Sequence, residues 1–223
     1  MHGHSLTGSR LQTLSLSSMG PDRHELLKWL IHPECPIDLR ELKEFIFHAD
    51  IEIDHKMFCR LLSIIPSTLE HLTYRPPPQT IRANAMGLRL LNDFHLSRFP
   101  HLRSFTLYTH LSAREEFSEI GFSNWSAIFL LSLPKPSTLE SLRMRCNWNT
   151  FASNRFISPE SDDVRLRRWE DLDSFLSSEA FSNLSGVFLH LALEDGSRYK
   201  DPCRDAIAGR LHRLQRQGKL LIL

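Results

Sequence analysis

The 223-residue chain predicts an α/β solenoid, with a curved parallel sheet on its concave face and helices on its convex face. Two observations support this fold class. The pentapeptide at 66–70, Pro-Ser-Thr-Leu-Glu, recurs letter for letter at 136–140. Both copies continue into the same apolar frame, L-x-x-L-x-L or a variant of it, and the frame recurs along the chain. Identical segments that keep their register with the apolar pattern around them indicate a repeat protein.

Each copy of the frame predicts one short strand. Its last two apolar positions alternate with other residues, which is the period of a strand with one buried face. The first leucines of successive frames lie 27 to 45 residues apart, so the repeats are unequal. A truncated last strand is expected at 219–223. The six first leucines are Leu11, Leu42, Leu69, Leu102, Leu139 and Leu184.

The frame also predicts which strand residues are buried. These residues should lie on adjacent parallel strands, with their side chains under the helices. They are Leu14, Leu16, Phe45, Phe47, Leu72, Tyr74, Phe105, Leu107, Leu142, Met144, Val187 and Leu189.

Between the strands, the apolar spacing changes to that of a helix. Several helical segments end in an apolar residue followed by proline, because proline disfavours helical geometry in the residue before it. Gly218 stands just beyond the last helix, where a left-handed stop is expected. The expected helical segments are 26–31, 57–65, 86–94, 169–176 and 204–217.

The leucine spacing resembles that of leucine-rich repeats over nearly the whole chain. Residues 1–223 are therefore expected to form a single domain of about six irregular repeats. The asparagine or cysteine that this family carries three residues after the last leucine of the frame occurs once, as Asn147. A polar segment at 147–168 lengthens its repeat and predicts a loop insertion. Both a tolerated surface loop and a partner-contacting or phosphorylated loop fit it.

Composition excludes several classes of protein. The formal net charge of +1 argues against a chain that seeks nucleic acid. No apolar run approaches the roughly 20 residues that cross a bilayer, and the first residues lack the layout of a signal peptide. We therefore expect no membrane partner and a cytoplasmic or nuclear location. The widely spaced Cys35, Cys59, Cys146 and Cys203 favour reduced thiols over disulfides or zinc ligands.

The sequence carries no catalytic signature. Nucleotide-binding, nucleophile-elbow and zinc-protease motifs are missing from it. Acidic pairs at 115–116, 162–163 and 171/173 stand in polar stretches, where solvated loops or helix starts are the simpler interpretation. Acid–base catalysis needs carboxylates that converge in a cleft. We expect no enzyme activity, no cofactor and no metal site.

The concave side of the predicted strands is the candidate binding surface. Strand residues that flank the buried leucines point to this side. Arg and Tyr, which are enriched in binding hot spots, recur there. The alternative is that exposed strand positions simply carry β-tolerant and long polar side chains. The candidate partner-binding residues are His48, Arg75, Tyr108, Arg143, Arg145, Phe188 and His190.

A closer family resemblance comes from two details. The Pro-x-x-Leu entry at Pro66 and Pro136 and the Trp-x-x-Leu helix at Trp169 resemble the leucine-rich region of fungal F-box proteins. The resemblance implies a module that recruits a protein substrate to a cullin-type ubiquitin ligase. An F-box signature does not appear before Leu11, so the ligase adaptor is an expected partner only if an F-box lies upstream. The alternative is a free-standing repeat scaffold that binds protein or RNA without a link to ubiquitin.

Overall fold

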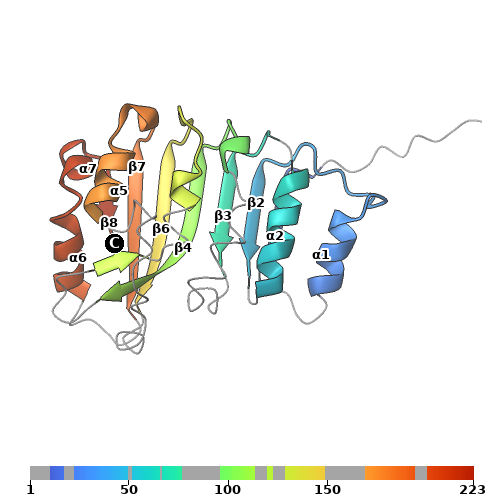
Figure 1. Ribbon diagram of the computed structural model, residues 1–223, viewed down its shortest axis with the longest axis horizontal. Coiled ribbons are helices and arrows are strands. Elements are labelled where there is room, and N and C mark those ends of the chain that lie inside the picture. Colours follow the sequence, from blue (N-terminus) through green and yellow to red (C-terminus); the bar gives the residue numbers. More distant parts are fainter. Residues whose placement is uncertain are drawn as a thin grey trace, which may run out of the picture.

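The computed structural model shows an α/β fold built on one sheet with seven parallel strands (Figure 1). The strand order is β1-β2-β3-β4-β6-β7-β8, and the short strand β5 joins β4 in the antiparallel direction. The parallel strands are β1 Thr13–Leu16, β2 Glu44–His48, β3 His71–Arg75, β4 Ser104–Ala113, β6 Ser141–Trp148, β7 Gly186–Leu193 and β8 Leu220–Ile222, and β5 is Ile120–Phe122. The structure describes residues 11–17, 23–49, 52–65, 67–76, 96–113, 120–122, 129–148, 169–193 and 200–223.

Helices connect the strands and lie on one side of the sheet in the described part of the chain (Figure 1). This arrangement follows from the parallel strand order, since parallel neighbours need a crossover rather than a tight hairpin turn. The α-helices are α1 Arg23–Ile31, α2 Glu52–Ile64, α5 Trp169–Leu176, α6 Lys200–Ala208 and α7 His212–Arg216. Short 3-10 helices within the described residues are η1 Leu96–Arg98 and η4 Glu179–Phe181.

The strand register confirms the apolar frame. The fourth position of the frame pairs directly from strand to strand across the sheet, from β1 to β7. Those partners are Leu14, Phe45, Leu72, Phe105, Leu142 and Val187. All twelve residues predicted to be buried are buried except Leu14, which is half-buried on the edge strand β1.

A repeated hydrogen-bond device fixes this register where the strands begin. In the first five frames, the carbonyl of the residue after the first leucine accepts two consecutive backbone N–H groups of the next frame, at 2.8 to 3.2 Å. One carbonyl thus satisfies two donors, and the device occurs five times in succession. The accepting carbonyls are those of Gln12, Lys43, Glu70, Arg103 and Glu140.

The repeated pentapeptide has a structural explanation in its threonine and leucine. The Thr138 hydroxyl donates to the carbonyls of Pro100 and Leu102, at 2.6 and 3.1 Å. Thr68 reaches the equivalent carbonyls of the preceding turn at 3.4 Å. Each threonine therefore ties its own turn to the turn before it. The leucine that follows, Leu69 or Leu139, is fully buried.

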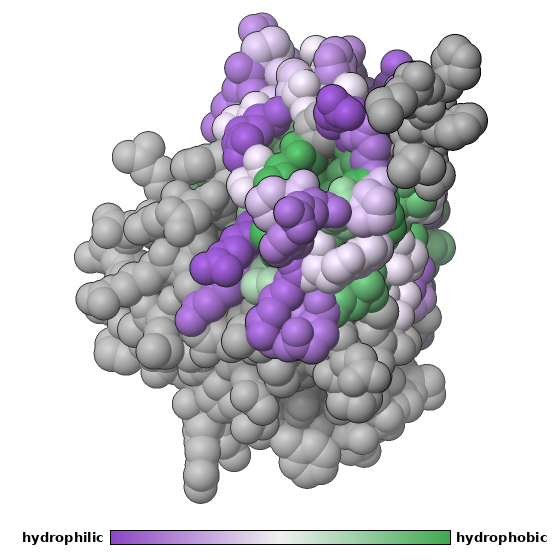
Figure 2. Space-filling view, turned by 90° about the vertical axis from the view of Figure 1, so that its right-hand side faces the viewer, coloured by the Kyte–Doolittle hydropathy of each residue, from purple (hydrophilic) through white to green (hydrophobic). Residues whose placement is uncertain are grey.

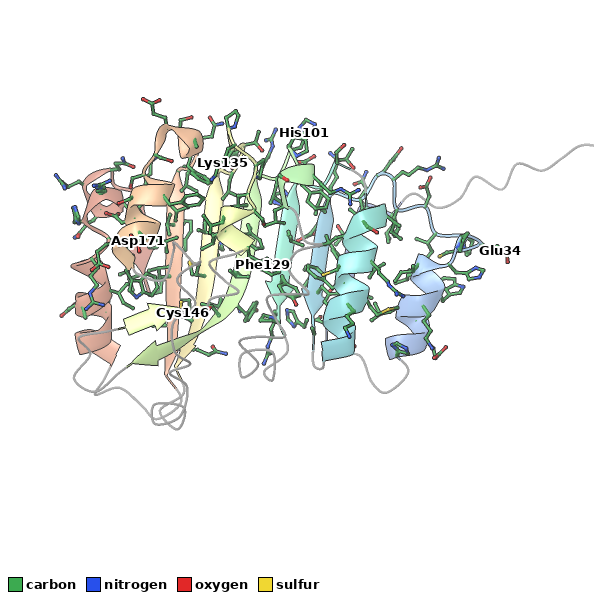
Figure 3. All side chains as sticks on the ribbon, in the orientation of Figure 1. Glu34, His101, Phe129, Lys135, Cys146 and Asp171 are labelled. Atoms are coloured by element: carbon green, nitrogen blue, oxygen red, sulfur yellow. The ribbon has the colours of Figure 1, made fainter. Side chains whose placement is uncertain are left out.

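Aromatic side chains fill the layer between the sheet and the helices. Phe58 of α2 stacks on Tyr74 of β3 with ring centroids 4.1 Å apart. Phe129 stacks on the same tyrosine at 5.2 Å, and Figure 3 shows Phe129 in the middle of the molecule. Burial raises the pKa of Tyr74 well above its usual value, with the nearby Cys59 and Asp54 adding to the effect. Tyr74 is therefore a neutral core residue.

The carboxyl-terminal helical segment differs from the expected single helix at 204–217. It forms two helices, because the chain leaves helical geometry at Leu211, where φ is −101° and ψ is 40°. Gly209, just past the end of α6, lowers the helical preference there. The left-handed stop is confirmed, since Gly218 has a φ of 67°.

Two other predicted segments fall partly or wholly outside the described residues. The helix expected at 86–94 lies outside them, as does most of the insertion expected at 147–168. The first two residues of that insertion, Asn147 and Trp148, belong to strand β6, because β6 pairs with β4 and β7 over eight residues.

The end of the molecule formed by α1 and β1 presents apolar surface between polar residues (Figure 2). Several apolar side chains of this end are only half-buried, because no further strand pairs with β1 among the described residues. They are Leu11, Leu14, Leu26 and Ile31.

Candidate interaction surface on the open face of the sheet

All seven predicted binding residues lie on the sheet face opposite the described helices, which we call the open face. The alternation of side chains places them there, since their neighbours Phe47, Tyr74, Leu107, Met144 and Leu189 are buried on the helix side. No described helix covers this face (Figure 1). The seven residues therefore share one face of the sheet, while the concave shape of this face and its role in binding stay predictions.

Five of the seven residues form a continuous line across five neighbouring strands, which we call the basic row. His48 on β2 pairs in register with Arg75 on β3. Tyr108 on β4 pairs with Arg145 on β6, which in turn pairs with His190 on β7. With strands about 4.8 Å apart, the basic row extends for roughly 19 Å.

Tyr108 stands at the centre of the basic row and contacts three of its neighbours. Arg145 donates from Nη1 to the Tyr108 hydroxyl at 3.0 Å, and its Cζ lies 5.2 Å from the ring centroid. From the other side of β4, the Cζ of Arg75 lies 5.8 Å from the same centroid. The His48 ring meets Tyr108 edge-on at 5.4 Å. Each such cation–ring contact contributes roughly 0.5–1 kcal/mol at an exposed site.

The remaining two predicted residues form a second cation–ring pair beside the basic row. Arg143 and Phe188 are register partners, and the Arg143 Cζ lies 5.4 Å from the Phe188 ring centroid. Gly186 leaves room for this ring, since a Cβ at that position would come within 2.7 Å of Phe188 Cε2. A side chain at 186 would therefore push the ring away from its present position.

The three arginines of the open face, Arg75, Arg143 and Arg145, are exposed and have no carboxylate partner among the described residues. Elsewhere on the described surface, some basic side chains pair with an acid, while others, such as Arg60 and Arg213, do not. These pairs are Lys28–Glu25, Arg40–Asp38, Lys43–Glu70, Arg103–Glu140, Arg204–Asp201 and Arg210–Glu170. The open face thus holds cations that rest on aromatic rings and keep their charge available.

The structure also shows a polar depression of about 360 Å³ that the sequence did not indicate. It lies where the strands begin, at the edge where Figure 3 shows His101. Its charges are internally paired, with Arg103 3.6 Å from Glu140. Thr138 uses its hydroxyl on backbone carbonyls. The lining residues are His101, Arg103, Thr138, Glu140 and Asn183.

One member of the acidic pairs has a different role from the solvated one expected. Asp173 on α5 is 1% exposed and accepts the backbone N–H groups of Arg213 and Leu214, at 3.0 and 2.9 Å. It therefore caps the start of α7 from another element. Asp171, two residues earlier, is exposed as expected.

Metal-ligand clusters and membrane-spanning helices are not found among the described residues. No group of three or more His, Cys, Asp or Glu side chains in that part of the chain could hold a metal ion. Cys35, Cys59 and Cys146 form no disulfide, and the side chain of Cys203 lies outside the described set. None of the described helices is long and apolar enough to cross a membrane.

Comparison with known proteins gives no match. No family model, no curated protein and no solved structure matches the chain.

Proposed function

We propose that this chain is a leucine-rich-repeat solenoid of about six irregular repeats, and that it acts as a protein-interaction module through its open face. The basic row is the observation that favours this function most. A line of arginine, tyrosine and histidine across five strands has the composition of interface hot spots. The repeated backbone device at the start of the strands holds this surface on a rigid support.

The partner we propose is a protein substrate, as the resemblance to the leucine-rich region of fungal F-box proteins implies. In such a receptor, the repeats select the substrate and a separate F-box recruits the ligase adaptor. The coding sequence upstream of Met1 tests this link directly, because an F-box in frame would supply the adaptor-binding element. Co-purification of the longer protein with a cullin adaptor would then follow.

RNA binding is the alternative that the arginines raise. Two features of the structure weigh against it. Guanidinium groups from both neighbouring strands pack on Tyr108, so its ring is not free to stack a nucleobase. The whole chain carries a formal charge of only +1, while proteins that bind nucleic acid depend on many phosphate contacts.

Site-specific photo-crosslinking tests the proposed function. A photoreactive benzoylphenylalanine replaces Thr106, in the middle of the open face, and in a matched variant it replaces Arg60 on the exposed side of α2. We expect discrete protein adducts from position 106 that are absent from position 60. Adding Arg75→Ser and Arg145→Ser should remove them. Equal adducts from both positions, or adducts only with RNA, would contradict the assignment.

A further inference from the structure

The basic row also indicates which kind of protein segment binds. We propose that the partner contributes an extended, carboxylate-rich segment that crosses strands β2 to β7 along the basic row. This inference depends on the proposed function, because it names the chemistry of the ligand for the same surface.

The positive charge of the open face favours an anionic ligand. Apart from Glu44 near the edge strand β1, the open-face strand positions at the basic row and before it carry no acidic residue among the described side chains. Glu44 is occupied locally, since its Oε2 accepts from the Thr13 hydroxyl at 3.3 Å. Apart from Arg145 Nη1, which donates to the Tyr108 hydroxyl, the guanidinium groups of the three arginines rest on aromatic rings and make no bond to a described carboxylate. A surface of this sign favours an anionic ligand.

The distances between the arginines of the open face fit an extended segment. Arg75 and Arg145 lie two strands apart, which is about 10 Å, while Arg143 and Arg145 lie two residues apart on β6, which is about 7 Å. An extended chain advances about 3.3 Å per residue. Acidic side chains three residues apart along such a segment therefore match the distance between Arg75 and Arg145, while Arg143 lies beside the row, on the same strand as Arg145. The whole row corresponds to about six extended residues.

The distribution of positive charge on the open face favours several carboxylates over a single phosphate. A phosphate group has a compact charge and is bound best where several donors converge on one point. Here Arg75 and Arg145 lie on opposite sides of Tyr108, and Arg145 is held by the Tyr108 hydroxyl. The positive charge is therefore distributed along a line, which suits several separate carboxylates.

Fluorescence anisotropy with defined probes tests the proposal. The main probe is a labelled twelve-residue peptide with Glu at every third position and Ser elsewhere. The other probes are the same peptide with Gln for Glu, a Ser peptide with one phosphoserine, and a twelve-nucleotide oligo-U RNA. We expect the affinity for the Glu peptide to be at least about 10-fold higher than the affinity for the Gln or phosphoserine peptide. Binding should weaken steeply as salt rises, because the pairs are exposed.

Charge-matched variants locate the site. Arg75→Ser with Arg145→Ser should weaken binding of the Glu peptide about 10-fold, since each exposed pair contributes a few-fold in affinity. Arg213→Ser with Arg216→Ser on α7 removes the same charge from another surface and should leave affinity within about two-fold. Circular dichroism and urea unfolding show whether both double variants keep the fold, which we expect because all four side chains are exposed.

The outcomes distinguish this inference from the proposed function. If position 106 still crosslinks to a protein while the Glu peptide binds no better than the Gln peptide, the acidic-segment proposal is overturned and the interaction module stands. The phosphoserine peptide binding tightest, or equal losses in the two double variants, also overturns it. If oligo-U RNA binds tightest and position 106 crosslinks only to RNA, both proposals fail.

Discussion

Replacing Asp173 by Ala should destabilise the protein by about 3 kcal/mol, although this residue belongs to no candidate binding surface. The carboxylate is 1% exposed and accepts two backbone N–H groups at the start of α7, at 2.9 and 3.0 Å. A hydrogen bond to a charged group contributes about 1.5–3 kcal/mol, and a buried donor left without an acceptor costs about 1–3 kcal/mol. Leu214 is fully buried, so water cannot replace the carboxylate at its N–H without opening the core.

Urea unfolding measures this loss as a shift of the unfolding midpoint, provided that the slope of the unfolding free energy against urea concentration stays the same. Asp173→Asn retains one acceptor oxygen and should lose about half as much free energy. The matched control is Asp171→Ala on the same helix, which is exposed and should cost about 0.5 kcal/mol or less. Amide exchange at Leu214 should accelerate in the Asp173 variants only. Equal losses at 171 and 173 would refute the capping role.

Three further predictions concern the repeat architecture, each measured by urea unfolding. Leu142→Ala should lower the free energy of unfolding by about 2–5 kcal/mol, because it leaves a cavity at a fully buried position. Arg143→Ala, at an exposed position, should change it by about 0.5 kcal/mol or less. Similar losses at the two positions would contradict the strand register. Thr138→Val should lower the free energy of unfolding by about 1 kcal/mol, and Thr68→Val should lower it less, because the Thr68 hydrogen bonds are longer. The reverse order would show that these hydrogen bonds between turns do not stabilise the protein as described. Gly218→Ala should lower the free energy of unfolding by about 1 kcal/mol, because the φ of this residue is 67°. Gly209→Ala, whose Cβ would lie 3.4 Å from the nearest atom, should leave the free energy of unfolding almost unchanged. An unchanged stability in Gly218→Ala would show that a glycine is not required to end the helix.

The strand register and the open face could be predicted because both depend on local periodicity. A strand alternates its side chains, so the leucines of one frame fix which neighbours face away from the helices. The repeated frame then aligns Arg75, Tyr108 and Arg145 even though the residues between them vary in number. The contacts around Tyr108 follow from that alignment, although their distances do not.

Features that depend on contacts between distant segments could not be predicted in this way. Asp173 caps a helix that begins about 40 residues later, and no spacing rule connects the two. The break at Leu211 belongs with that cap, since a second helix can start there only if its first N–H groups find acceptors. Strands β4, β6 and β7 extend well past the three-residue core of the frame, because each pairs with long neighbours on the sheet. The antiparallel strand β5 carries no frame at all.

Backbone hydrogen bonds at the start of the strands reconcile unequal repeats with a regular sheet. At the start of the strands, the same carbonyl device recurs in five successive frames and leaves no room for a change of register. Variation in repeat length must therefore lie beyond the strands, and loops accept extra residues at low cost. The described connections that lead into the strands already vary, from the 12 residues at 32–43 between α1 and β2 to the 3 residues at 217–219 between α7 and β8. Because the carbonyl device fixes the first residues of each strand, the side chains of the basic row stay aligned whatever the length of the connection before them.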